Sequence, residues 1–168
     1  VCLLLPQPAL AAADSGNCGG DLTWVLDEEG VLTVSGTGAM MDCGWNGSLQ
    51  PYVSYRDQVR HLVVEEGITT TAGANFAYLP NLQTVSLPNT LQIISNYAFV
   101  SSFADDAEPL RIPASVSYIG RYSFGYYPGS TCWVTDVILE NPNVVFATST
   151  DENGNPILQK NGKPVLKK

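Results

Sequence analysis

The sequence has few of the residues from which catalytic and metal sites are usually built. Of its 168 residues, one is histidine and four are cysteine, and charged residues make up 14%. No two cysteines form a Cys-x-x-Cys pair, so we expect no zinc site and no other bound metal. His61, the one histidine, has no Gly-x-Ser-x-Gly elsewhere in the chain to complete a serine hydrolase signature. We therefore expect a protein without enzymatic activity and without a cofactor.

Pairs of acidic residues are the remaining source of catalytic chemistry. They occur as Glu65-Glu66, Asp105-Asp106 and Asp151-Glu152, and a glycosidase uses two carboxylates. All three pairs fall where the sequence predicts turns, and solvated charge is common at turns. A hydrolase is therefore kept only as a remote alternative.

Basic residues and long apolar runs are scarce as well. The chain has 8 Lys and Arg against 16 Asp and Glu, a net charge of −8, which argues against a nucleic-acid partner. It has no run of about 18 apolar residues that would predict a membrane span. The apolar residues 1–5 and the small residues that end at Ala13 are typical of the end of a secretory signal peptide. We expect residues 1–13 to be the remnant of such a peptide.

What the chain does have is an internal repeat. Two apolar positions recur with the same two steps, of 23 and 25 residues: Val64, Leu87 and Ile112, and then Phe76, Phe99 and Phe124. A period in this range is typical of solenoids, in which each repeat is one supersecondary unit stacked on the next. A single unit of this size cannot bury its own apolar face, so stacking has to supply one continuous core.

A short alternating run begins each repeat. In every run the first and third residues are large and apolar, which predicts a half-buried strand. The runs are Leu62–Val64, Val85–Leu87, Leu110–Ile112 and, after a longer step, Val137–Leu139. Glycine or proline follows within a few residues of the first three runs and predicts a turn. The fold class we expect is mainly β with short irregular or helical turns, in about four rungs.

The segment before the repeats has the features of a terminal cap. Residues 22–26 and 31–35 are two strand-like runs joined by a turn with Gly30, which predicts a β-hairpin. Such a cap has to cover the first open layer of the core, and Trp24 is our candidate lid, with Trp45, Tyr52 and Tyr55 beside it. We place the cap at residues 14–60 and the repeats at residues 61–146. For residues 147–168 we expect a C-terminal hairpin, which pairs 157–158 with 165–166, or the start of a truncated module.

Two cysteines fall within this cap. A disulfide between Cys18 and Cys43 would brace the hairpin against the first rung. The alternative is a pair of buried free thiols that pack as small apolar side chains.

The repeat pattern, apolar-x-Ile-Pro-x-x-Val-x-x-Ile-Gly-x-x-Ala-Phe, resembles that of the BspA-type leucine-rich repeat family of bacterial surface proteins. The resemblance covers roughly residues 17 to 146 and includes an N-terminal hairpin cap. It implies a right-handed leucine-rich-repeat solenoid with a β-sheet on its concave side. It also implies a secreted or cell-surface protein that adheres to proteins or glycans. The chain departs from the pattern at Thr71, which replaces Ile, and at Ser95, which replaces Gly.

Two surfaces are candidates for such binding. If alternate strand residues point inward, the others form a patch on the concave face. These residues are His61, Val63, Thr84, Ser86, Arg111, Asp136 and Ile138. The second candidate is an aromatic patch of Tyr78, Tyr126 and Tyr127, since tyrosine is favoured at interfaces. The alternative to a binding module is an architectural spacer that presents another domain.

Overall fold

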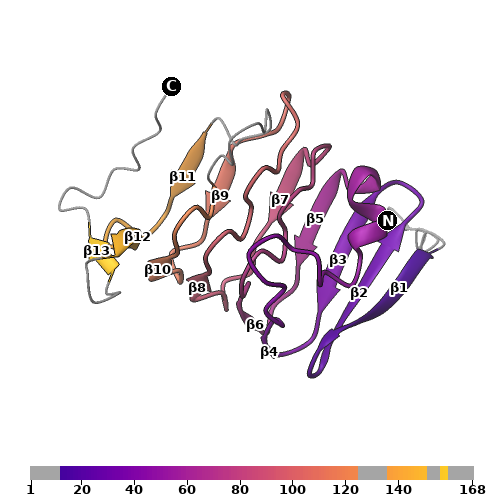
Figure 1. Ribbon diagram of the computed structural model, residues 1–168, viewed down its shortest axis with the longest axis horizontal. Coiled ribbons are helices and arrows are strands. Elements are labelled where there is room, and N and C mark those ends of the chain that lie inside the picture. The colour runs from indigo at the N-terminus through magenta and orange to yellow at the C-terminus, as the bar shows by residue number, and fades with distance from the viewer. Residues whose placement is uncertain (1–11, 125–135, 151–155, 159–168) are drawn as a thin grey trace, which may run out of the picture.

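Short strands stacked on one another form most of the structure (Figure 1). The computed structural model describes residues 12–124, 136–150 and 156–158. Within these residues the one helix is η1, a 3-10 helix at Val53–Gln58. The predicted strands at the start of the four repeats are present as β5, β7, β9 and β11 and mark successive turns of a β-solenoid. The fold class predicted from the sequence is therefore confirmed.

The first sheet contains the cap and the first two repeat strands. Its strand order is β1-β2-β3-β5-β7, antiparallel in the cap and parallel from β3 onward. The bounds are β1 Ala12–Gly19, β2 Leu22–Asp27, β3 Val31–Ser35, β5 His61–Val64 and β7 Thr84–Ser86. The stack continues beside β7 with a parallel pair, β9 Leu110–Ile112 and β11 Val137–Leu139 (Figure 1).

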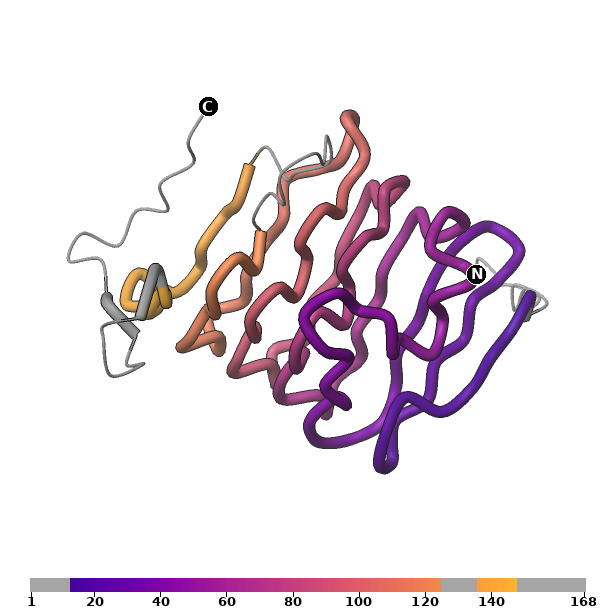
Figure 2. Tube along the Cα trace, in the orientation of Figure 1, coloured from indigo at the N-terminus to yellow at the C-terminus, as the bar shows by residue number. Residues whose placement is uncertain are grey.

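A second sheet lies along the other edge of the solenoid, where we had expected only irregular or helical turns. Its strand order is β13-β12-β10-β8-β6-β4. The bounds are β4 Gly38–Ala39, β6 Ile68–Thr70, β8 Ile93–Ile94, β10 Tyr118–Ile119, β12 Val145–Thr150 and β13 Pro156–Leu158. The chain winds in successive turns (Figure 2), and each turn from β3 to β12 contributes one strand to the row β3, β5, β7, β9 and β11 and one strand to the second sheet.

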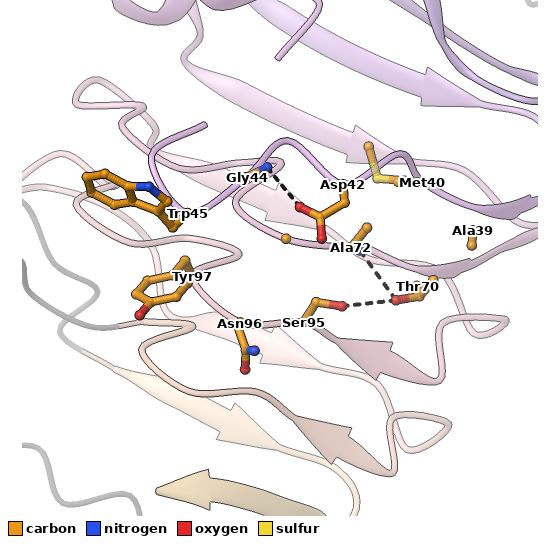
Figure 3. A pocket seen from close by; sticks show the side chains of 11 residues that line it. Ala39, Met40, Asp42, Gly44, Trp45, Thr70, Ala72, Ser95, Asn96 and Tyr97 are labelled. Atoms are coloured by element: carbon orange, nitrogen blue, oxygen red, sulfur yellow. Dashed lines mark hydrogen bonds between the residues drawn. The ribbon is translucent and has the colours of Figure 1, made fainter. Parts of the chain in front are cut away.

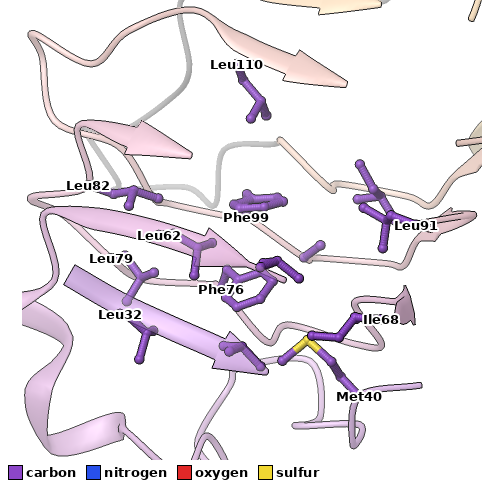
Figure 4. Packing of buried hydrophobic residues seen from close by; sticks show 14 of the residues in the cluster. Leu32, Met40, Leu62, Ile68, Phe76, Leu79, Leu82, Leu91, Phe99 and Leu110 are labelled. Atoms are coloured by element: carbon purple, nitrogen blue, oxygen red, sulfur yellow. The ribbon is translucent and has the colours of Figure 1, made fainter. Parts of the chain in front are cut away.

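The core lies between the two sheets and follows the predicted repeat. Leu62 and Val64 of β5 are buried, as are Leu110 and Ile112 of β9. The phenylalanines stack from turn to turn: the ring centroid of Phe99 lies 5.3 Å from that of Phe76 and 5.8 Å from that of Phe124. A further ring, Phe103, lies 5.7 Å from Phe99 (Figure 4 shows Phe76 and Phe99). One continuous apolar cluster therefore runs through the repeats, as the period required.

The cap hairpin is present where it was predicted, with Gly30 at φ 84° in its turn. Trp24 is buried and forms an edge-to-face contact with Tyr52 at 5.8 Å, so both cover the first core layer. Trp45 does not cover this layer, because it is 58% exposed. The expectation that Trp45 is part of the lid was wrong. Tyr55, which was also expected in the lid, packs against Trp24 with ring centroids 6.1 Å apart.

The cap has a third strand that the sequence did not predict. Strand β1 pairs antiparallel with β2 and forms the N-terminal edge of the first sheet. Gly16 of β1 lies directly against the indole of Trp24, where a Cβ would come within 2.8 Å of Nε1. Strand β1 begins at Ala12, so it includes the last two residues of the segment interpreted as a signal peptide.

A buried polar network joins the cap to the first turn. The side-chain amide of Gln50 donates to the carbonyl oxygens of Ala74 at 2.7 Å and Ala77 at 3.1 Å. Its own oxygen accepts from Arg56 Nε at 2.7 Å, and burial lowers the pKa of that guanidinium. Tyr52 Oη donates to the carbonyl of Asn75, and burial raises the Tyr52 pKa well above its ordinary value. These bonds satisfy main-chain groups that would otherwise be buried without partners.

At the C-terminal end, β13 pairs antiparallel with β12, with Ile157 opposite Ser149 and Leu158 opposite Ala147. A hairpin is thus present, and it consists of β12 and β13. Residues 165–166, the partner that we had predicted, lie outside the described residues.

Candidate functional site

The first candidate surface lies on the outward side of the repeat strands. In β5, Leu62 and Val64 are buried while His61 and Val63 alternate with them and are half-buried. Val63 pairs with Ser86 of β7, which is exposed. The alternation predicted from the sequence is therefore present in β5, and in β7 the half-buried Val85 packs against the core next to the exposed Ser86.

The same alternation continues in the next two rungs. Arg111 of β9 is exposed between two buried neighbours, and it pairs with Ile138 of β11, which is 37% exposed. Asp136 is also exposed, and its carbonyl accepts a hydrogen bond from the backbone N–H of Leu110 at 2.9 Å. The structure thus brings the predicted concave-face residues onto one side of the strand stack.

This surface, which we call the sheet face, has a mixed chemistry. His61 and Thr84 face each other across β5 and β7, with His61 Nδ1 2.9 Å from Thr84 Oγ1. Val25 of the cap adds an apolar side chain that is 40% exposed. Arg111 supplies positive charge and Asp136 negative charge. The arrangement suits contact with a partner that has both apolar and polar groups.

The predicted tyrosine patch is described only in part. Tyr78 is half-buried against a small cluster of Ala74, Ala77 and Val100. The guanidinium carbon of Arg56 lies 5.3 Å from the centre of the Tyr78 ring, a cation–π contact. Tyr126 and Tyr127 lie outside the described residues.

A second concave surface was not predicted from the sequence. It is a groove of about 510 Å³, a volume within the usual range of ligand sites (Figure 3). It is lined by Ala39, Met40, Asp42, Gly44, Trp45, Thr70, Ala72, Gly73, Ser95, Asn96 and Tyr97. We call it the Trp45 groove. Three segments form it: the stretch that follows β4, the end of β6 with its turn, and the turn after β8.

The polar side chains of the Trp45 groove are fixed by short hydrogen bonds. Asp42 Oδ1 accepts from the backbone N–H of Gly44 at 2.8 Å, and Thr70 Oγ1 lies 3.2 Å from Ser95 Oγ (Figure 3). Asn96 Oδ1 accepts from the backbone N–H of Arg121 at 2.7 Å. The sequence signal for this site was Trp45, a tryptophan outside any predicted strand, which we had expected in the cap lid.

The two cap cysteines are buried free thiols in this structure. The Cys18–Cys43 bridge is thus absent, and the alternative of two packed thiols is present. Cys43 Sγ lies 3.4 Å from Asn75 Oδ1, and burial raises the pKa of each thiol to about 11. The raised pKa favours the protonated thiol at neutral pH, and it is the thiolate that acts as a nucleophile.

The described residues hold few candidates for chemistry or membrane insertion. Within residues 12–124, 136–150 and 156–158, no three His, Cys, Asp or Glu side chains gather as a metal site would require. In the same part of the chain, no helix has the length and apolar character needed to cross a membrane.

Stacked parallel strands with a buried apolar ladder define a leucine-rich-repeat solenoid. The family model for the BspA type leucine rich repeat region (6 copies) matches residues 48–140, more than half of the chain. The chain belongs to the BspA-type leucine-rich repeat family. Among curated proteins, none matches the chain.

Two solved structures of bacterial proteins are similar to this chain. A leucine-rich repeat protein from Eubacterium ventriosum ATCC 27560 has 24% identity and a TM-score of 0.56, over 81% of this chain and 44% of that protein. A leucine rich cell surface protein from Faecalibacterium prausnitzii A2-165 has 13% identity and a TM-score of 0.41, over 86% of this chain and 60% of that protein. The chain thus spans less than two thirds of the length of either. The first likeness supports the fold.

Proposed function

We propose that this chain is a non-catalytic binding module of a secreted or cell-surface bacterial protein. It adheres to an extracellular protein or glycan through the surface of the solenoid. Membership of the BspA-type leucine-rich repeat family supports a binding or adhesion role. The net charge of −8 makes nucleic acid an unfavourable partner.

The observation that carries the proposal is the sheet face. Its side chains are not required by the core, which the alternate residues of the same strands fill. Val63 pairs with Ser86 and Arg111 pairs with Ile138, and strand β9 lies beside β7 (Figure 1), so outward residues recur across four strands. A rigid row of this kind is pre-organised, which lowers the entropic cost of binding an extended partner.

An architectural spacer is the alternative role. A spacer needs solvated polar side chains on its outer surfaces, and apolar exposure there would promote association. Val25 is 40% exposed and Ile138 is 37% exposed on the sheet face. These two side chains support the binding role.

The test is to present the full chain to arrays of extracellular matrix proteins and glycans, together with generic peptidase and glycosidase substrates. We expect saturable binding without turnover of any substrate. Substrate turnover would instead favour the hydrolase, and a complete lack of binding would favour the spacer.

A double substitution, Ser86→Glu with Arg111→Glu, locates the contact. Both residues are exposed, so folding should be unchanged while binding to the sheet face is weakened by the new negative charge. The control is Gln92→Glu with Ser117→Glu, which adds two negative charges at exposed positions beside the second sheet, against a change of three in the sheet-face variant. Binding that the control weakens as much as the sheet-face variant would contradict the assignment of the contact to the sheet face.

A further inference from the structure

The Trp45 groove is a separate surface from the sheet face, formed on the turns that lead into and out of the second sheet. From its geometry we propose that it binds a neutral carbohydrate, with one sugar ring against the aromatic side chains. This inference rests on the proposed binding role but requires no ligand at the sheet face.

The aromatic end of the groove contains an exposed and a half-buried aromatic side chain, Trp45 and Tyr97. Trp45 is 58% exposed, and Tyr97 lies at the same end of the groove (Figure 3). The faces of aromatic rings carry partial negative charge. The C–H groups on the face of a pyranose ring are weakly positive and apolar, so they stack on such surfaces.

Tyr97 is held in place before any ligand arrives. Its backbone has φ 60°, an uncommon conformation for a bulky residue. The turn-to-turn stack fixes it there, because the N–H of Tyr97 donates to the carbonyl of Arg121 at 2.9 Å. The Tyr97 ring also stacks on that of Tyr122, with centroids 5.4 Å apart and planes 16° apart. The platform is therefore pre-organised, which reduces the ordering cost of binding.

The polar part of the groove matches the hydroxyl groups of a sugar. Asp42 uses Oδ1 for Gly44 and has a second carboxylate oxygen to accept from a sugar hydroxyl. Asn96 uses its oxygen for the main chain, so its Nδ2 is a donor. The hydroxyl groups of Thr70 and Ser95 can each donate or accept a hydrogen bond. Sugar hydroxyls both donate and accept, so they satisfy this mixed set.

Two glycines allow these polar side chains to lie where they do. A Cβ on Gly73 would come within 2.6 Å of Asp42 Oδ1, and one on Gly120 would come within 2.6 Å of Asn96 Oδ1. A larger residue at either position would move the acceptor or the donor. The acceptor and the donor are thus both positioned by close packing against the neighbouring turn.

The charge of the groove excludes other small ligands. Among the described residues that line the groove, Asp42 is the one with a charge, and the whole chain is acidic, so a phosphorylated, sulfated or sialylated ligand is disfavoured. A quaternary ammonium ligand would use Trp45, Tyr97 and Asp42. It would leave Asn96, Thr70 and Ser95 without a role. A neutral carbohydrate uses both halves of the groove.

The experiment measures binding of the full chain to a panel of oligosaccharides by calorimetry. The probes are neutral oligomers of glucose, mannose, galactose and N-acetylglucosamine, with sialyllactose and phosphocholine as charged comparisons. We expect saturable binding of at least one neutral oligomer and none of the charged probes. Trp45→Ala should weaken that binding about fivefold to tenfold through loss of the stacked ring.

Three further variants separate the groove from other causes. Asp42→Asn keeps an oxygen to accept from Gly44 and removes the anionic acceptor, so it should weaken sugar binding without lowering the melting temperature. Leu49→Ala removes an apolar side chain that is 63% exposed and outside the groove, so binding should not change. The sheet-face variant Ser86→Glu with Arg111→Glu should also bind the sugar normally.

Several results would overturn the inference. They are no binding of any neutral oligomer, binding that survives Trp45→Ala, and a preference for phosphocholine or sialyllactose. Sugar binding that is lost in the sheet-face variant and kept in Trp45→Ala would move the glycan site to the sheet face. If the chain binds a protein partner that the sheet-face variant no longer binds, and binds no sugar, the proposed function is supported and the groove is not a sugar site.

Discussion

Phe99 is the position at which the repeat can be tested most sharply. Its ring is 1% exposed and lies 5.3 Å, 5.7 Å and 5.8 Å from those of Phe76, Phe103 and Phe124. Replacement by alanine removes all three aromatic contacts and leaves a cavity between adjacent turns. Buried Phe to Ala changes cost about 3–5 kcal/mol. The rigid stack on both sides leaves little room for collapse, so we expect a cost toward the upper end of that range.

The assay is thermal and guanidinium unfolding of the full chain followed by circular dichroism. For a chain of this length, a loss of 3–5 kcal/mol lowers the melting temperature by about 6–20 °C. Leu49→Ala is the control, because this exposed side chain should change stability by less than about 0.5 kcal/mol. If Phe99→Ala has the same melting temperature as Leu49→Ala, the phenylalanine stack does not stabilise the packing of the turns and the repeat register is wrong.

Three further perturbations test the cap and the surface. Gln50→Ala should destabilise the fold by about 1–3 kcal/mol because it removes the side-chain donor to the carbonyl of Ala77 and the acceptor of Arg56 Nε. Equal denaturant midpoints for Gln50→Ala and the exposed Gln92→Ala would contradict this. The N–H groups of Asn89 and Thr90 lower the pKa of Glu66. The contribution of ionised Glu66 to the stability of the fold is present above the ordinary pKa of 4.5 and is lost as pH falls through the lowered pKa. Glu66→Gln should therefore lose less stability on acidification than the parent, and parallel pH profiles of the unfolding midpoint would refute it. Burial raises the thiol pKa of Cys18 and Cys43 to about 11, so iodoacetamide at pH 8 should label their peptides only after unfolding; rapid labelling of the native chain would show that the thiols are accessible.

The strand stack was predictable because it depends on large apolar side chains at a fixed period. Leu62 with Val64, and Leu110 with Ile112, alternate as a half-buried strand requires. The phenylalanines close each unit at the same spacing, so the register of the core followed from the sequence. The hairpin turn was predictable because Gly30 supplies a positive φ.

The second sheet and β1 were harder to predict because their residues do not alternate between apolar and polar side chains. Strands such as β8, Ile93–Ile94, and β10, Tyr118–Ile119, are too short to show an alternation. Strand β1 contains Gly16 and Asn17, which have low strand propensity. It forms because the small Gly16 lets it lie against Trp24.

The Trp45 groove could not be predicted because it depends on backbone geometry that only the stacked turns impose. Tyr97 at φ 60° has a conformation that propensity would assign to glycine or asparagine. Trp45 is a large aromatic residue, and burial is the usual expectation for one near a cap. The structure leaves it exposed because Trp24, Tyr52 and Tyr55 already cover the first core layer.

The described residues of the groove come from the end of β4 with the segment that follows it and from the next two turns, between Ala39 and Tyr97. Each later turn repeats the same strand positions against its predecessor. A whole repeat could therefore be inserted or removed after Phe124 without displacing any of these described lining residues. Selection on the length of the array, which sets how far the module extends, can proceed independently of selection on the groove.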